Sequence, residues 1–204
     1  SAAGLILAMG GELLLGLLIG LVVAACFVGV QMGGTMIAQE SGLAFGEIAD
    51  PETNESHTVL SAVYMQLATV VFLIVGGHRI LLAASLDTFQ SIPLLGDNGV
   101  TDVGTDLLVD SLAVGASMAI RVAAPAVVTL FLVNVALGFI SRTVPQLNIT
   151  TIGFSLKALI GFVIMAISLP AAMAAFVDGL DQVFDWIAAL TGGMPAGAGL
   201  EADL

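Results

Sequence analysis

Four long apolar stretches, separated by polar connectors, dominate the pattern along the chain. They are Leu13–Gln39, Thr58–Ile80, Val122–Ser141 and Thr143–Phe176. The first runs for 27 residues without a charged side chain, and the second and fourth are interrupted only by His78 with Arg79 and by Lys157. An apolar run of about 20 residues is long enough to cross the hydrocarbon core of a bilayer as a helix. The pattern therefore predicts an all-α membrane protein.

Turn and breaker residues divide these stretches into long kinked helices and helical hairpins. Pro125 interrupts the third stretch, and a proline inside a helix removes a backbone hydrogen bond and kinks or breaks it. The chain is accordingly predicted to be a single membrane domain over residues 1–204. Its expected parts are a helix over 12–38, a connector over 39–58, a helix over 59–91, a broken helical hairpin over 105–177 and an amphipathic tail over 178–204.

Composition agrees with a chain whose surface is covered by lipid or by partner helices. Hydrophobic residues make up 58% of the sequence, mean hydropathy is +1.10 and charged residues are only 10%, against about 25% in a soluble domain. The net charge of -12 comes from acidic residues gathered in the connectors and the tail. Such acidic loops argue against nucleic acid as a partner, because binding its phosphates requires Lys and Arg. Solvation of the loops is the simpler interpretation.

Catalytic and metal-binding patterns are missing from the sequence. There is no HExxH pair and no glycine-rich phosphate loop after a strand, and Cys26 has no second cysteine to pair with. We therefore expect no catalytic residue, no metal, no cofactor and no enzymatic activity. Among the ionisable residues, His78 suits either a proton relay or an ordinary helix-end histidine. Lys157 suits either a pair with a carboxylate of a neighbouring subunit or a lysine that snorkels toward the membrane surface.

Two groups of residues are predicted to contact other subunits. In the first apolar stretch, small residues recur four apart, which makes a groove where another helix can approach closely, and a carboxylate stands at the expected helix start, where it suits the helix dipole. In the hairpin connector, a proline fixes the turn beside two amides that can bond exposed backbone of a neighbour. With Lys157, the predicted interface comprises Glu12, Gly16, Gly20, Gly29, Gly33, Pro145, Gln146, Asn148 and Lys157.

The connector after the first helix combines sizeable apolar side chains with glycines in an acidic setting. Glycine lets the backbone bend, and each large apolar side chain is worth about 1.5–3 kcal/mol on full burial. Such a loop suits a bendable seal for a narrow pore, or alternatively a helix lying on the bilayer or on another subunit. The residues of this candidate gate are Gly42, Leu43, Phe45, Gly46, Ile48 and the turn Asp50-Pro51.

Several segments together resemble the FliR family of flagellar export proteins and their counterparts in virulence type III secretion. The segments are Gly34-Thr-Met-Ile-Ala38, Gly42-Leu-Ala-Phe45, Asp50-Pro51, Gly77-His78, Asp87-Thr-Phe89, Ile92-Pro93, the run Ala136-Leu-Gly-Phe-Ile-Ser-Arg-Thr-Val-Pro-Gln-Leu-Asn148 and Ile152-Gly-Phe154. The likeness covers about Glu12–Val183. Because the family carries about two further helices ahead of this region, an N-terminal piece is expected to be missing from the sequence.

The resemblance implies a function and a setting. The chain would be a subunit of the type III export gate in the bacterial inner membrane, in the flagellar basal body or an equivalent apparatus. It would assemble with FliP-like and FliQ-like subunits around a path for unfolded export substrates. The C-terminal hairpin would resemble the two-helix FliQ, and the connector after the first helix would lie in the pore as a plug. The alternative is a self-contained small-molecule transporter or channel.

Overall fold

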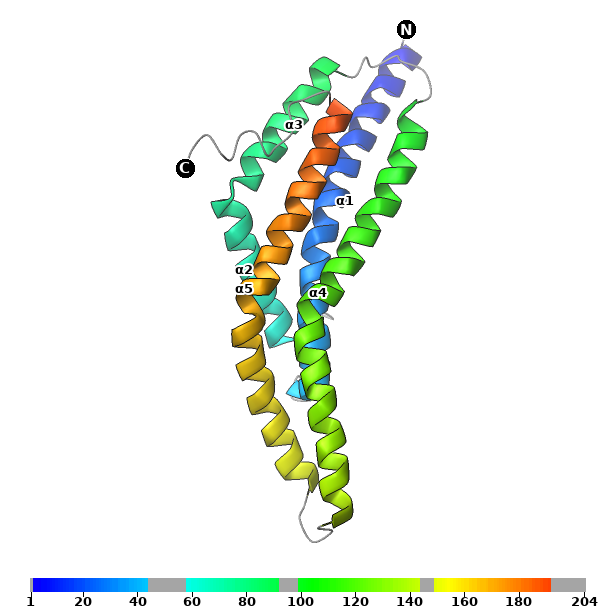
Figure 1. Cartoon of the computed structure of the whole chain (residues 1–204). Coiled ribbons are helices and arrows are strands. Elements are labelled where there is room, and N and C mark those ends of the chain that lie inside the picture. Colours follow the sequence, from blue (N-terminus) through cyan, green and yellow to red (C-terminus); the bar gives the residue numbers. More distant parts are fainter. Residues whose placement is uncertain (1, 44–57, 92–98, 144–148, 192–204) are drawn as a thin grey trace, which may run out of the picture.

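The computed structural model describes residues 2–43, 58–91, 99–143 and 149–191, and it contains five helices and no strand within these ranges. They are α1 (Ala2–Ser41), α2 (Val59–Ile74), α3 (Gly77–Ser91), α4 (Gly99–Thr143) and α5 (Ile149–Thr191). Figure 1 shows them as an elongated bundle. The prediction of an all-α membrane protein is confirmed, since three of the helices are long and apolar enough to span a bilayer.

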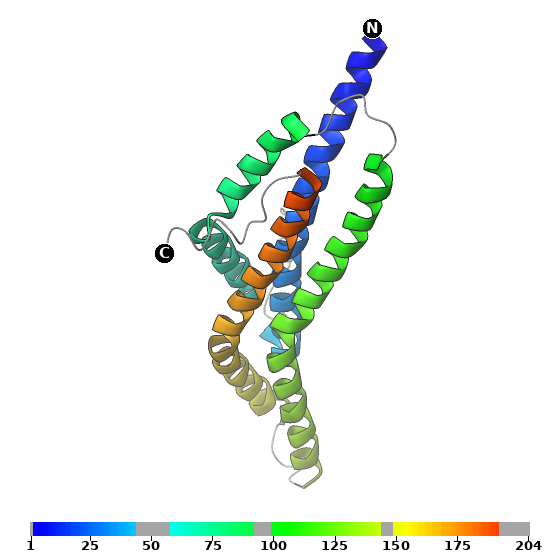
Figure 2. The ribbon, with the colours of Figure 1, turned by 45° about the horizontal axis from the view of Figure 1, so that its top comes forward.

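Helix α1 is the element around which α2, α4 and α5 pack. It contacts α4 most extensively and also contacts α2 and α5. Helices α4 and α5 run antiparallel as a hairpin, whose lower part extends past the end of α1 in Figures 1 and 2. The buried core follows α1, where the Phe27 ring makes edge-on contacts with Phe72 of α2 and Phe176 of α5, at centroid distances of 5.3 and 5.2 Å. Three elements are thus joined at one point.

The predicted single helix over 59–91 is wrong, because the chain bends by 64° between α2 and α3. Gly76 adopts a φ of +79°, a left-handed conformation that ends a helix and that glycine adopts without a steric penalty. The amide of Val75 still donates to the carbonyl of Val71 at 2.9 Å. The bend is also packed, since a Cβ on Gly77 would overlap the ring of Phe72. His78 and Arg79 therefore lie exposed in the first turn of α3 instead of within one long helix.

Replacing Gly76 with alanine is expected to destabilise this bend. No atom crowds the position beyond ordinary contact, so the expected loss of about 1–2 kcal/mol in unfolding free energy comes from the left-handed backbone alone. Thermal unfolding of the detergent-solubilised chain measures it. Gly138→Ala is the matched control, because Gly138 lies in a helix with open space around it and alanine favours a helix there. Equal melting temperatures for the two variants would contradict the argument.

At Pro125 a kink or a break was predicted, and the break is wrong, as is the predicted boundary between hairpin and tail at residue 178. Helix α4 continues through Pro125 and α5 through Pro170. In a long helix the flanking turns keep the helix intact despite the missing N–H. Thr129 Oγ1 donates to the carbonyl of Pro125 at 2.8 Å, a back-bond of the kind that often bends a helix. The axis of α4 changes direction along its middle (Figure 1), as expected where a proline bends a helix. Residues 178–191 stay helical because Val183, Phe184 and Ile187 are buried in the same core.

Helix α1 begins at Ala2, ten residues before the predicted start. The residues ahead of Glu12 carry no charge and no proline, so nothing in this segment ends the helix. Glu12 consequently lies inside α1, and the predicted helix-dipole role at its start is wrong.

Candidate functional site

The first two residues of the candidate gate are anchored to the bundle. Helix α1 ends at Ser41, and Gly42 follows with a φ of +79° and an amide that donates to the carbonyl of Gln39 at 3.2 Å. A Cβ on Gly42 would lie 3.3 Å from the ring of Phe154 in α5, and Leu43 is half-buried against the core. The connector therefore begins at a fixed point. The other predicted gate residues, Phe45, Gly46, Ile48, Asp50 and Pro51, lie outside the described residues.

Both helices that flank the connector have ends held by specific contacts. On the α1 side, a Cβ on Gly161 of α5 would come within 2.7 Å of the Ser41 Cβ, so the two backbones are in close approach. On the α2 side, buried Thr58 caps the helix by accepting a hydrogen bond from the Ser61 amide at 3.1 Å, the bond by which threonine satisfies a free amide at a helix start. Residues 44–57 thus join two firmly placed helix ends.

The four glycines of the predicted α1 interface divide into two pairs. A Cβ on Gly29 would lie 2.5 Å from the carbonyl oxygen of Gly115, and one on Gly33 would lie 2.7 Å from the Val122 side chain. These two glycines face α4 of the same chain, so their assignment to a subunit interface is wrong. A Cβ added to Gly16 or Gly20 would meet nothing within 4 Å outside the helix's own backbone, and the residues beside them are exposed, among them Leu13, Leu17 and Leu21.

The remaining predicted interface residues are only partly described. Lys157 is half-buried in α5, while Pro145, Gln146 and Asn148 lie outside the described residues. Glu12 is placed in α1 without a described side chain. The prediction that these residues contact neighbouring subunits therefore stays a prediction.

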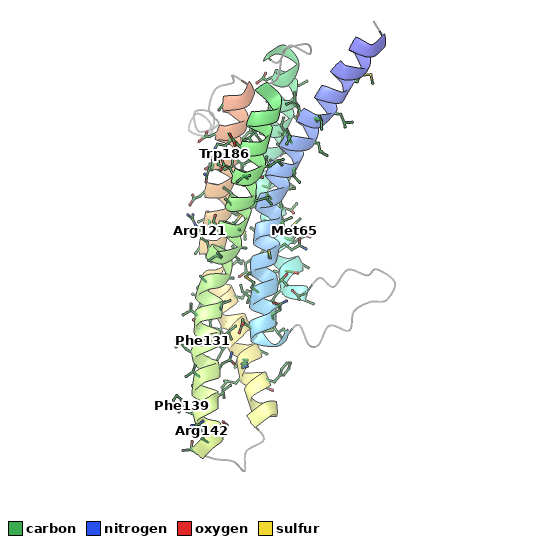
Figure 3. The ribbon with its side chains drawn as sticks, turned by 90° about the vertical axis from the view of Figure 1, so that its right-hand side faces the viewer. Met65, Arg121, Phe131, Phe139, Arg142 and Trp186 are labelled. Atoms are coloured by element: carbon green, nitrogen blue, oxygen red, sulfur yellow. The ribbon has the colours of Figure 1, made fainter. Side chains whose placement is uncertain are left out.

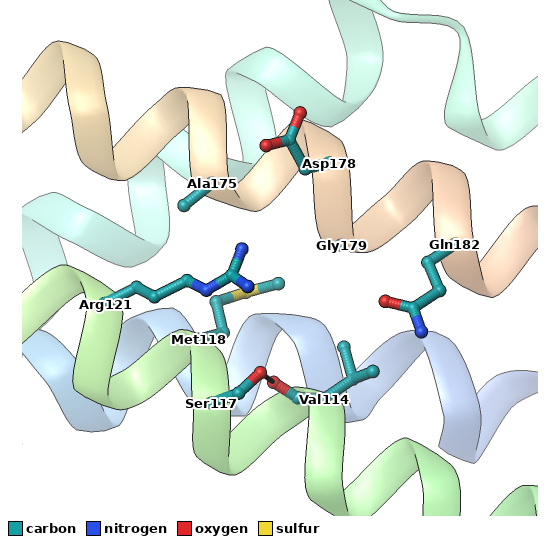
Figure 4. A pocket seen from close by; sticks show the side chains of 8 residues that line it. All are labelled: Val114, Ser117, Met118, Arg121, Ala175, Asp178, Gly179 and Gln182. Carbon is teal, nitrogen blue, oxygen red and sulfur yellow. Dashed lines mark hydrogen bonds between the residues drawn. The ribbon is translucent and has the colours of Figure 1, made fainter.

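A polar pocket between α4 and α5 is a feature that sequence reasoning missed. It has about 50 Å³ of room for water and is lined by Val114, Ser117, Met118, Arg121, Ala175, Asp178, Gly179 and Gln182. Figure 4 shows the Arg121 side chain reaching from α4 toward α5, where Asp178 and Gln182 lie on the facing helix. A site this polar and this large suits ordered water. Arg121 and Asp178 are 57 positions apart in the sequence. No local motif indicates that they lie at the same level of the bundle.

Within the described ranges, no three His, Cys, Asp or Glu residues are grouped closely enough to hold a metal ion. What the described surface offers instead is apolar area. Large exposed side chains follow α1 above Gly20 and both arms of the α4–α5 hairpin, including Phe131, Phe139 and Phe162. Figure 3 shows Phe131 and Phe139 on the side of α4 turned away from α1. Contiguous apolar surface of this kind is typical of contact with lipid or with other subunits.

Comparison with known proteins gives a consistent result. The model of the family "Bacterial export proteins, family 1" matches residues 1–183. The chain is 29% identical over 192 residues to the flagellar biosynthetic protein FliR of Escherichia coli, covering 90% of this chain and 70% of that protein. It is 30% identical over 160 residues to FliR of Bacillus subtilis, covering 76% and 61%. The secretion system apparatus protein SsaT of Salmonella typhimurium is 25% identical over 189 residues, covering 86% and 70%.

Proposed function

Since the chain belongs to the bacterial export proteins of family 1, we propose that it is a membrane subunit of a flagellar or related type III secretion export apparatus. The observation that carries this proposal is the family match over residues 1–183, shared by relatives named for flagellar biosynthesis and for a secretion apparatus. The chain spans 61 to 70% of the length of these three relatives. Activity, partners and substrates of the whole protein are therefore part of the proposal.

The proposed partners are FliP-like and FliQ-like subunits, with which the chain forms a gate in the bacterial inner membrane for unfolded export substrates. Two features of the structure support assembly. Helix α1 leaves Gly16 and Gly20 uncovered beside exposed leucines, and small residues let a second helix approach closely. The α4–α5 hairpin leaves apolar side chains exposed on both arms. A self-contained small-molecule transporter gains no support from the relatives.

In this proposal the connector is the seal of the gate. Its ends are fixed by the Gly42–Phe154 contact and by the Thr58 cap, so the proposed sealing residues lie in the sequence between two anchored helix ends. The apolar residues Phe45 and Ile48 are the sealing groups, and Gly46 supplies the freedom to bend. No catalytic step is assigned to the chain.

Copurification tests the proposal directly. An affinity-tagged chain, expressed with the FliP-like and FliQ-like proteins encoded by the same organism, should retain both through solubilisation in a mild detergent. Loss of both partners, with the chain itself intact and membrane-inserted, would overturn the proposed function. Export of a flagellar or secreted substrate in a strain that lacks the native protein is the functional readout.

The hairpin connector provides a second test. Replacing Gln146 and Asn148 together with alanine is expected to weaken copurification with the partners, because both amides can bond exposed backbone at the end of a neighbour's helix. Membrane insertion should be unchanged. Exposed Gln66 of α2 is a suitable control site for an amide-to-alanine change. Partner yield that is the same for the double variant and for Gln66→Ala would show that the turn is not a contact.

A further inference from the structure

The hairpin α4–α5 is too long for one membrane. Its two apolar spans, Asp106–Thr143 and Gly153–Ala189, have 38 and 37 residues, or about 57 and 55 Å at the rise of an α-helix. A hydrocarbon core is about 30 Å thick. Only part of the hairpin can therefore lie in lipid, and the positions of the charged residues indicate which part.

Charges divide both arms at the same level. In α4, the uncharged run Val122–Ser141 is 20 residues long and lies between Arg121 and Arg142. In α5, the uncharged run Ala158–Val177 is also 20 residues long and lies between Lys157 and Asp178. Each run is about 30 Å long, the thickness of the hydrocarbon core.

The upper boundary is formed by residues that meet in space. Arg121 and Asp178 line the same polar pocket although they belong to different helices. Beyond them, toward the start of α4 and the end of α5, acidic side chains are exposed on both helices, among them Asp110 and Asp185. A bilayer centred on Arg121 would place Arg121, Asp178 and Asp185 in hydrocarbon, where ionisable side chains are costly.

The lower boundary is formed by cations. Arg142 is exposed in the last turn of α4, and Lys157 stands two turns into α5. A helical side chain points toward the N-terminus of its helix, which for Lys157 is the hairpin tip, and the long lysine stem snorkels to the membrane surface. Between the two boundaries the outer face of the hairpin is apolar, with Phe131 and Phe139 on the side of α4 turned away from α1 (Figure 3).

We propose that lipid covers only this bracketed half of the hairpin, Val122–Ser141 with Ala158–Val177, and that the remainder of α4 and α5 stands outside the hydrocarbon. Within this half, lipid covers only the outer face of the hairpin, which is turned away from α1. The end of α1 exposes Gln39 and Glu40 at the depth of Gly161, so the inner face at that depth is turned to protein or water. This inference depends on membrane insertion and holds whether or not the chain is an export subunit.

One consequence concerns the upper half of α1. The contact of Gly29 with Gly115 places residues 9–21 of α1 at the level of the part of α4 that precedes Arg121. The exposed leucines around Gly16 and Gly20 then lie above the hydrocarbon, where lipid does not cover them. This surface is thereby separated from the lipid-facing half of the hairpin.

The single tryptophan of the chain makes the inference testable by fluorescence. In a Trp186→Phe background, one tryptophan is placed by Leu112→Trp or by Phe131→Trp. Both positions are on α4 and are well exposed, at 70% and 61%, and they lie about 14 and 15 Å on either side of Arg121. The full chain is reconstituted into phosphatidylcholine vesicles whose acyl chains are brominated near the bilayer centre, which quenches only tryptophans in contact with the acyl chains.

Phe131→Trp is expected to lose severalfold in fluorescence relative to unbrominated vesicles, and Leu112→Trp is expected to lose almost none. Equal quenching at both positions would place the bilayer centre at Arg121 and overturn the inference, as would quenching at neither. The pair Val109→Trp and Leu132→Trp, exposed at 66% and 61%, repeats the measurement if one variant fails to fold. Repeating it in the copurified complex tests whether a partner subunit displaces lipid from Phe131, which would also overturn the inference.

Discussion

Leucine in place of Gly29 is expected to prevent α1 from packing against α4 and to abolish the folded bundle. A Cβ at this position would lie 2.5 Å from the carbonyl oxygen of Gly115 and 3.1 Å from its Cα. Both are backbone atoms, so no side chain can turn aside to make room. Overpacking of a well-packed core typically costs 1–3 kcal/mol, and we expect about 3 kcal/mol or more here, because two helix backbones must separate.

Gly20→Leu is the matched contrast for this prediction. Gly20 is in the same helix, and a Cβ added there would meet nothing within 4 Å outside the helix's own backbone. The isolated chain should therefore unfold at the temperature of the parent or slightly higher, because leucine favours a helix over glycine. Its effect should appear only in assembly, as a loss of copurifying subunits caused by steric exclusion. Thermal unfolding and partner yield, measured side by side on both variants, separate the two roles. A Gly29→Leu chain that is as stable as the parent would refute the packing argument.

Serine in place of both Phe45 and Ile48 is expected to make the assembled complex leak ions. If the closed gate alone buries these side chains, their loss removes about 2–3 kcal/mol of differential burial. That amount shifts a two-state equilibrium by about 30- to 150-fold toward the open state. The measurement is membrane potential or ion conductance in cells that express the variant together with its partners.

Leu43 is expected to affect the stability of the bundle more than the gate, unlike Phe45 and Ile48. It packs on the bundle next to Gly42, and Gly42 is held against Phe154. Leu43→Ser should therefore lower the stability of the chain more than it opens the gate, and it is the control for the double variant. A tight membrane in cells that assemble the Phe45→Ser, Ile48→Ser complex would locate the seal in another subunit.

Helix content and membrane character followed from the sequence because both depend on local properties. The four apolar runs became α1, the bent pair α2–α3, α4 and α5. The bend at Gly76 was missed although two adjacent glycines lie within the second run, because hydropathy does not register backbone conformation. At Pro125 a kink or a break was predicted, and only the break is wrong, because a proline that would break a short helix is tolerated in one of 45 residues.

The candidate site was harder to predict because its contacts join distant parts of the chain. Spacing alone predicted that Gly29 and Gly33 face another helix, but it did not reveal that this helix is α4 of the same chain. The anchor of Gly42 is Phe154, 112 positions away, and nothing near either residue signals the contact. Pairings of this kind are properties of the tertiary structure, whereas the chemistry of each residue is readable from the sequence.

The pairing of Gly29 with Gly115 also sets a delay in biogenesis. Eighty-six positions separate the two residues. At a synthesis rate of about 5–20 residues per second, Gly115 is therefore made roughly 4–17 s after Gly29. Throughout that interval a strip of small residues is open to any apolar helix nearby, including α4 of another nascent copy. The central helix of the bundle is thus made well before α4, the helix that it contacts most extensively. Insertion must keep it shielded until the C-terminal hairpin arrives.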